Sequence, residues 1–133
     1  MHMLHHLSLA TTDLKRSSAF YDAALAPLGY RRVCSHDTFA GYGVKDNEDK
    51  FALKLITEGA TIPSEGTHLA FSAPNRKAVD EFYAEAMKHG GTDNGGFGVH
   101  SEYGPNYYTA FVFDPDGYRI EAVICGPATL SED

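Results

Sequence analysis

Two patterns of apolar positions alternate along this chain, and each pattern occurs twice. Apolar and polar residues alternate over residues 5–10 and 67–72, which predicts two short strands. Behind each strand, apolar residues spaced three or four positions apart predict a helix. Asp13 and Asn75 precede these helical stretches and are favourable N-cap residues. Each half of the chain is therefore expected to open with a strand followed by a helix.

The two halves also match each other position by position. Three motifs recur with a constant separation of 62 residues: His6-Leu7 with His68-Leu69, Phe20-Tyr21 with Phe82-Tyr83, and Gly29 with Gly91. Such self-similarity indicates two copies of one supersecondary unit. We define unit 1 as residues 4–58 and unit 2 as residues 66–125, with a linker over 58–66.

The rest of each unit predicts strands. They are expected over residues 30–35, 39–44, 51–57, 107–113 and 118–124. The last two form a hairpin around the turn Asp114-Pro115-Asp116-Gly117. Six glycines between residues 90 and 105 predict a loop with one irregular strand. The predicted fold class is α+β: two tandem βαβββ units that form one curved, mostly antiparallel sheet around a cleft, with both helices outside.

Strand alternation predicts which side chains face that cleft. Because Leu7 and Leu69 are expected to pack against the helices, His6 and His68 face the cleft from equivalent positions. Ser8 shares the face of His6. The first strands of the two units therefore bring two imidazoles to the same concave surface.

The closing hairpin adds a carboxylate. If its turn holds four residues, Ala110 lies opposite Glu121, and the cleft side carries Tyr108, Arg119 and Glu121. Glu121 is also the one charged residue in the apolar run from Ile120 to Ile124. It is therefore expected to face the same cleft as the two histidines.

Two imidazoles and one carboxylate form a ligand set that suits a divalent transition metal with open coordination positions. His6, His68 and Glu121 are the predicted ligands, and the ion is Fe(II), Mn(II), Zn(II) or Ni(II). In the alternative interpretation both histidines are ordinary polar residues, and Glu121 pairs with Arg119 or lies exposed.

These motifs resemble the vicinal oxygen chelate superfamily, which includes glyoxalase I, bleomycin-resistance proteins, fosfomycin-resistance enzymes and extradiol dioxygenases. The resemblance rests on the opening His6-Leu-Ser-Leu-Ala-Thr-Thr-Asp-Leu14 and on the closing Asp114-Pro-Asp-Gly117 with Glu121. It implies a single domain over residues 1–133, with the same three metal ligands. It also implies a small-molecule substrate and a homodimer, since paired units in this superfamily often pack with those of a second chain.

The resemblance leaves the reaction open among several chemistries. The first choice is a glyoxalase-type lyase that activates a small oxygen-chelating substrate by Lewis-acid catalysis. That enzyme normally has a fourth ligand where this chain has Lys54. An extradiol dioxygenase is expected to have a tyrosine where Phe111 stands. A fosfomycin-type thiol transferase matches in length, in ligand pattern and in the hydroxyl of Ser8. A metal-free, bleomycin-resistance-like drug-binding protein is the remaining alternative.

Further residues have candidate roles beside simpler ones. Tyr108 is a candidate catalytic residue with Glu121, and its phenol would hydrogen-bond a metal-bound oxygen. Lys54 and Arg119 are candidates for binding an anionic substrate. His100, in the glycine-rich loop, is a candidate lid residue or proton shuttle. In the simpler interpretations, Lys54 is an exposed strand residue and His100 lies in a surface loop. Tyr108 is then a core residue or lines the rim of the pocket.

Composition excludes several other classes of protein. Of 133 residues, 43% are hydrophobic and 22% charged, which is ordinary for a globular chain. No apolar run approaches the roughly 18 residues of a membrane-spanning helix. The net charge of −7, without a basic patch, argues against nucleic acid. Cys34 and Cys125 form no Cys-x-x-Cys motif and no secretory signal is evident, so a cytoplasmic location is expected.

Overall fold

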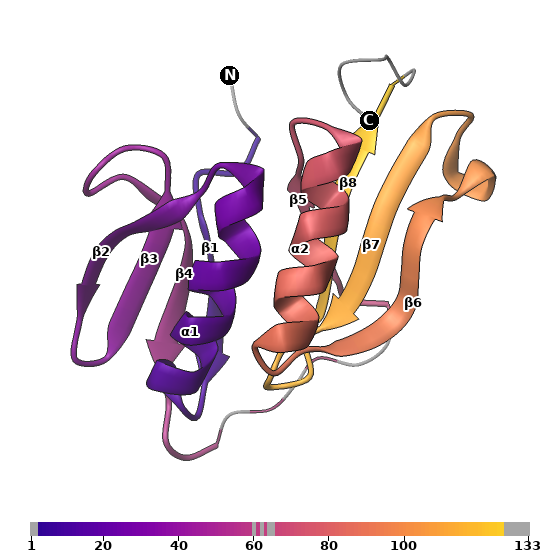
Figure 1. Cartoon of the computed structure of the whole chain (residues 1–133). Coiled ribbons are helices and arrows are strands. Elements are labelled where there is room, and N and C mark those ends of the chain that lie inside the picture. The colour runs from indigo at the N-terminus through magenta and orange to yellow at the C-terminus, as the bar shows by residue number, and fades with distance from the viewer. Residues whose placement is uncertain (1–2, 60, 62, 64–65, 127–133) are drawn as a thin grey trace.

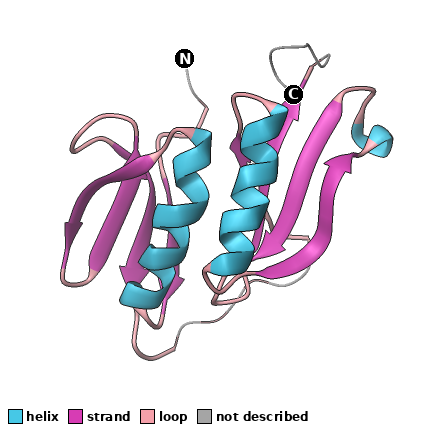
Figure 2. Ribbon diagram, viewed as in Figure 1, coloured by secondary structure: helices cyan, strands magenta, loops and turns pink. Residues whose placement is uncertain are grey.

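The computed structural model describes residues 3–59, 61, 63 and 66–126, which form two βαβββ units (Figures 1 and 2). Unit 1 comprises β1 (Leu7–Thr11), α1 (Leu14–Leu25), β2 (Arg31–His36), β3 (Phe39–Gly43) and β4 (Asp49–Leu55). Unit 2 comprises β5 (Leu69–Ser72), α2 (Arg76–Lys88), β6 (Thr92–Val99), β7 (Tyr107–Phe113) and β8 (Arg119–Cys125). Two short 3₁₀ helices, η1 (Ala26–Leu28) and η2 (Ser101–Tyr103), follow α1 and β6. The predicted α+β class and βαβββ repeat are confirmed.

Both helices begin where the sequence predicts. The side chain of Asp13 accepts a hydrogen bond from the backbone N–H of Arg16, 3.0 Å away, and Asn75 accepts one from Ala78 at 2.8 Å. These caps satisfy backbone donors that have no partner inside the helix. After α1, Gly29 has a φ of 95°, a left-handed conformation that glycine adopts without steric cost.

The strands form two open sheets rather than the single curved sheet that was predicted. The strand orders are β1-β4-β3-β2 and β5-β8-β7-β6. In each sheet the first strand of the unit pairs in parallel with the last, and the other pairs are antiparallel. Figure 1 shows the sheets side by side behind the helices. β1 is therefore an edge strand of the first sheet, and β5 is an edge strand of the second.

One hydrophobic core joins the two units. The helices α1 and α2 lie next to each other (Figure 2) and bury Phe20, Tyr21 and Phe82 completely. Leu53 from unit 1 and Ile120 from unit 2 complete the core on the sheet side. Burying each such side chain stabilises the fold by roughly 1.5–3 kcal/mol. The contact between the two helices therefore determines the relative orientation of the units.

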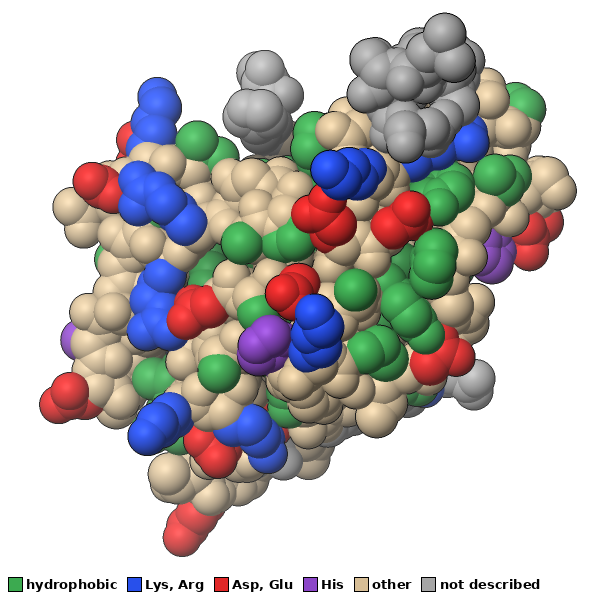
Figure 3. All heavy atoms as spheres, in the orientation of Figure 1, with side chains coloured by type: hydrophobic (Ala, Val, Ile, Leu, Met, Phe, Trp, Pro, Cys, Tyr) green, Lys and Arg blue, Asp and Glu red, His purple; other side chains and the backbone are tan. Residues whose placement is uncertain are grey.

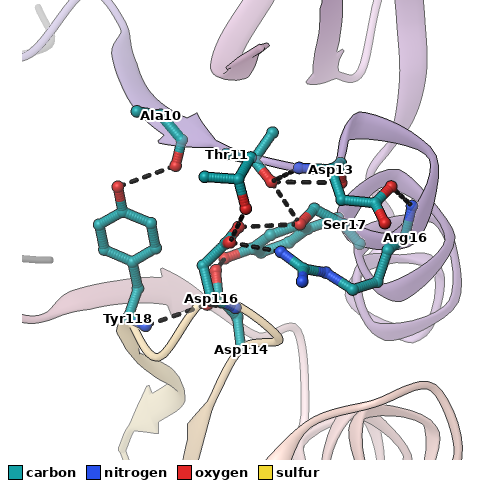
Figure 4. A network of polar contacts seen from close by, with 10 residues as sticks. Ala10, Thr11, Asp13, Arg16, Ser17, Asp114, Asp116 and Tyr118 are labelled. Carbon is teal, nitrogen blue, oxygen red and sulfur yellow. Dashed lines mark hydrogen bonds and ion pairs between the residues drawn. The ribbon is translucent and has the colours of Figure 1, made fainter. Parts of the chain in front are cut away.

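A polar cluster, which we call the turn clasp, also joins the units (Figure 4). The turn between β7 and β8 reaches the start of α1, where the carboxylate of Asp116 accepts hydrogen bonds from Arg16 and from Ser17 Oγ, the latter at 3.0 Å. Next to it, the buried Tyr21 hydroxyl donates to Asp114 Oδ2 at 2.5 Å. The Asp-Pro-Asp-Gly turn therefore connects the end of unit 2 to the beginning of unit 1.

The surface carries charges of both signs. On the helix-bearing face, Lys and Arg side chains are interspersed with Asp and Glu (Figure 3). Among the described residues, no helix is both long and apolar enough to span a bilayer.

Candidate active site

The β7–β8 hairpin determines which side chains reach the candidate site. Phe113 pairs with Arg119, so the turn holds the five residues 114–118 instead of the predicted four. Phe111, and not Ala110, therefore lies opposite Glu121. Because alternate residues of a strand face opposite sides, this one-residue change reverses the faces expected for β7.

Tyr108 consequently lies on the helix side of the sheet, and the expectation that it faces the cleft is wrong. Its hydroxyl donates to Asp80 Oδ1 of α2 at 2.6 Å, and the guanidinium of Arg76 lies 4.9 Å from its ring centroid. Its neighbour Tyr107 faces the candidate site instead. Alternation from Glu121 would have identified Tyr107 and Thr109 only if the turn length had been known.

The concave face of the second sheet carries a pocket of about 480 Å³, which we call the unit 2 pocket. It is lined by the segment before β5, the start of β8, and residues of β6, β7 and η2. Side chains with candidate chemistry line it: His68, His100, Glu102, Tyr103, Tyr107, Arg119 and Glu121. Four of the predicted site residues (His68, His100, Arg119 and Glu121) are therefore brought together.

Glu121 is the most deeply buried polar side chain that lines this pocket. It is only 1% exposed, and its Oε2 accepts hydrogen bonds from Tyr107 Oη at 2.5 Å and Thr109 Oγ1 at 2.7 Å. Its Oε1 lies 3.2 Å from His68 Nε2. Burial, together with the hydrogen bond to Glu121 and its negative charge, raises the pKa of the Tyr107 phenol. Tyr107 therefore remains a hydrogen-bond donor to Glu121 at physiological pH.

Three other side chains with candidate chemistry line the same pocket. The side chain of His68 is 54% exposed, so its ring is accessible from the pocket. His100 Nδ1 lies 3.5 Å from the carboxylate of Glu102. The Arg119 guanidinium lies 5.5 Å from the Phe113 ring centroid, a cation–π distance. The unit 2 pocket thus combines a buried carboxylate, two imidazoles and a guanidinium.

The predicted site residues of unit 1 do not enter the unit 2 pocket. His6 is exposed and lines a separate groove of about 600 Å³ near β1 and β5, and its Nδ1 lies 2.8 Å from His5 Nδ1. Ser8 and Lys54 lie on β1 and β4, opposite Ala52 and Ala10 respectively, and line neither pocket.

The expected set of three ligands is therefore not assembled within one copy of the chain. Among the described residues, no cluster of three or more His, Cys, Asp or Glu side chains is close enough to hold a metal ion. The predicted site residues divide by repeat unit. His68 and Glu121 meet in unit 2, whereas His6 lies in unit 1.

Comparison with known proteins identifies a family model and several solved structures that are similar to this chain. A family model described as Glyoxalase/Bleomycin resistance protein/Dioxygenase superfamily matches residues 3–122. No curated protein matches the chain. A crystal structure of a glyoxalase/bleomycin resistance protein from Albidiferax ferrireducens is 28% identical, with a TM-score of 0.80 over 92% of this chain and 98% of that one.

Two more distant structures share the fold. A glyoxalase-related enzyme from Fulvimarina pelagi is 18% identical, with a TM-score of 0.70 over 97% of this chain and all of that one. A mutant of glyoxalase I from Zea mays is 23% identical, with a TM-score of 0.64 over 89% of this chain but 45% of that one.

Proposed function

Because the chain belongs to the glyoxalase/bleomycin resistance protein/dioxygenase superfamily, we propose that it is a divalent-metal-dependent enzyme acting on a small oxygen-chelating substrate. A glyoxalase-type lyase is the first reaction to test, ahead of dioxygenase and thiol-transferase chemistry. The observation that carries the proposal is the buried Glu121 carboxylate, which directs one oxygen at the accessible imidazole of His68.

The donor chemistry of this pair suits a transition metal. Two ligands bound about 2.1 Å from one ion at roughly a right angle are about 3 Å apart, close to the 3.2 Å between His68 Nε2 and Glu121 Oε1. Imidazole and carboxylate are ligands for Fe(II), Mn(II), Zn(II) and Ni(II) alike. When bound, such an ion would polarise a substrate oxygen as a Lewis acid.

The surrounding residues would position this pair and the substrate. Tyr107 and Thr109 hold Oε2 of Glu121, which leaves Oε1 directed at His68. Outer hydrogen bonds of this kind orient metal ligands and tune their basicity. Arg119 would bind a negatively charged substrate oxygen, and His100, held by Glu102, would exchange protons with it.

We assign the third ligand to a second copy of the chain. His6, Ser8 and Lys54 belong to unit 1, and the unit 2 pocket contains none of them. In a twofold homodimer, unit 1 of each copy could face unit 2 of the other, which would produce two equivalent sites. His6 of one copy would then join His68 and Glu121 of the other.

Metal content tests the site. Elemental analysis of the untagged protein should find about one transition metal per chain, as the proposed stoichiometry requires. His68→Ala should lose the metal, and Tyr108→Phe, which changes the opposite face of β7, should keep it. Retention of stoichiometric metal by His68→Ala would refute the assignment.

Mixing two inactive variants tests the shared site. His6→Ala and His68→Ala should each lose the metal, but one of the two sites in a mixed dimer has both histidines intact. Random exchange of subunits should therefore restore metal to about a quarter of the sites. If each site is made within one chain, mixing restores none.

A metal-free drug-binding protein is the second candidate. The absence of a three-ligand cluster among the described residues of one chain favours it, and the net charge of −7 suits a cationic drug. A monomer that takes up none of the four metals would support this candidate over the enzyme.

A further inference from the structure

The outer wall of the unit 2 pocket is built from aromatic rings. The rings of His100 and Tyr103 are stacked, with centroids 6.0 Å apart and an interplanar angle of 26°. Phe111 meets His100 edge-on at 5.2 Å, and Tyr107 lies 5.2 Å from Tyr103. Tyr103 is 60% exposed, so its ring is accessible to a ligand although its neighbours hold it in place.

The wall beside these rings carries little side-chain bulk. Gly95 has a φ of +125°, and a Cβ added there would lie 3.6 Å from the Phe111 ring. Gly66, with a φ of +99°, also lines the pocket. These left-handed conformations favour glycine, so at these two positions the pocket lining carries no side chain.

The charges of the pocket leave one cation available to a ligand. Glu121 is engaged by two hydroxyls and His68, and Glu102 is paired with His100. Arg119 forms no ion pair within 4.0 Å with any described residue. Its guanidinium can therefore bind an anionic oxygen in a bidentate manner.

We propose that the unit 2 pocket is selective for a planar aromatic ring that bears an anionic oxygen group, a carboxylate or a phenolate. The ring lies against the stacked His100 and Tyr103, and the anionic oxygen binds Arg119. This inference rests on the proposed function only in taking the unit 2 pocket as the substrate site. It requires no metal, because the rings and the guanidinium belong to the chain itself.

Isothermal titration calorimetry with 2-naphthoate, in buffer containing EDTA, tests the proposal. Cyclohexanecarboxylate carries the same charge without an aromatic ring, and 2-naphthalenemethanol carries the ring without the charge. Cyclohexanecarboxylate should bind about fivefold more weakly than 2-naphthoate, because it lacks the aromatic contact. 2-Naphthalenemethanol should bind about tenfold more weakly, because it lacks the charge that pairs with Arg119. Equal affinity of cyclohexanecarboxylate, or no binding of 2-naphthoate, would overturn the proposal.

Variants separate the two contacts. Tyr103→Leu should weaken 2-naphthoate about fivefold and leave cyclohexanecarboxylate unchanged, whereas Arg119→Gln should weaken both acids about tenfold. Phe97→Leu is the matched control, because Phe97 is a 50% exposed aromatic residue that does not line the pocket. If Tyr103→Leu binds 2-naphthoate as tightly as this control, the aromatic wall has no role.

The proposed metal site and the proposed aromatic selectivity can be refuted independently of each other. Tyr103→Leu should retain the metal content of the unmodified protein, since Tyr103 is not a proposed ligand. Loss of metal in His68→Ala with normal binding of 2-naphthoate would support both proposals. Normal metal content with no preference for the aromatic acid would overturn only the specificity.

Discussion

At the scale of single residues, the candidate site depends on one buried carboxylate. Glu121 is 1% exposed, and a charge so placed is costly unless hydrogen bonds or an opposite charge compensate it. Its position in an apolar run made it conspicuous in the sequence. Its partners Tyr107 and Thr109 could not be recognised in the same way, because they approach Glu121 only through the pairing of β7 with β8.

The Thr109 hydroxyl is expected to contribute measurably to stability. It lies 2.7 Å from Glu121 Oε2 and 2.9 Å from the backbone oxygen of Ala122, and the residue is fully buried. Thr109→Val keeps the shape but leaves the carboxylate short of a donor, so the free energy of unfolding should fall by roughly 1–3 kcal/mol. Urea denaturation measures this. The exposed Thr92→Val on β6 is the control, and an equal loss there would contradict the argument.

At the scale of elements, much of the fold could be predicted. The strand-helix openings, both N-caps and the repeat all followed from local patterns. The differences came from pairing, which is not local. The turn after Phe113 holds one residue more than predicted, and the strands form two sheets instead of one. The irregular strand expected in the glycine-rich segment is present, but β6 extends over eight residues. Pairing with β7, with a bulge between Asp93 and Gly96, overrides the weak strand propensity of Gly95 and its neighbours.

Two neighbouring tyrosines on β7 test the observed register. Tyr107 donates to Glu121 on the pocket side, whereas Tyr108 donates to Asp80 on the helix side. Loss of an outer hydrogen bond to a metal ligand typically lowers metal affinity 10- to 100-fold. Tyr107→Phe should therefore weaken metal binding by roughly that factor, while Tyr108→Phe should not change it. Competition with a metal-chelating dye measures both affinities. Weakening by Tyr108→Phe, with none by Tyr107→Phe, would favour the register first predicted.

At the scale of the whole molecule, the sequence shows which residues belong to each unit. It does not show whether the two units of one chain contribute to the same site. His6 and His68 occupy equivalent positions in the repeat, which correctly relates the two units. Whether those units face each other within one chain depends on contacts between α1 and α2 and on the turn clasp. The observed side-by-side arrangement places His6 and the unit 2 pocket in different parts of the molecule.

The turn clasp should make the stability of the fold depend on pH in the acid range. Burial alone would raise the pKa of Asp116, but the hydrogen bond from Ser17 and the charge and hydrogen bond of Arg16 help to lower it below its usual value. The ionised carboxylate therefore stabilises the fold above about pH 4, and this contribution is lost as the pH falls through the lowered pKa. The pKa of its neighbour Asp114 is raised by burial, so its titration has the opposite sign.

The difference in stability between Asp116→Asn and the unmodified protein separates the contribution of Asp116 from that of Asp114. Asp116→Asn should be less stable than the unmodified protein at pH 7, by roughly 1–2 kcal/mol, and the gap should narrow as the pH falls below about 4. Urea denaturation between pH 3 and 7 follows the gap. The exposed Asp37→Asn should give a curve parallel to that of the unmodified protein. A gap that stays constant down to pH 3 would mean that the clasp acts through shape and hydrogen bonding alone, without the charge of Asp116.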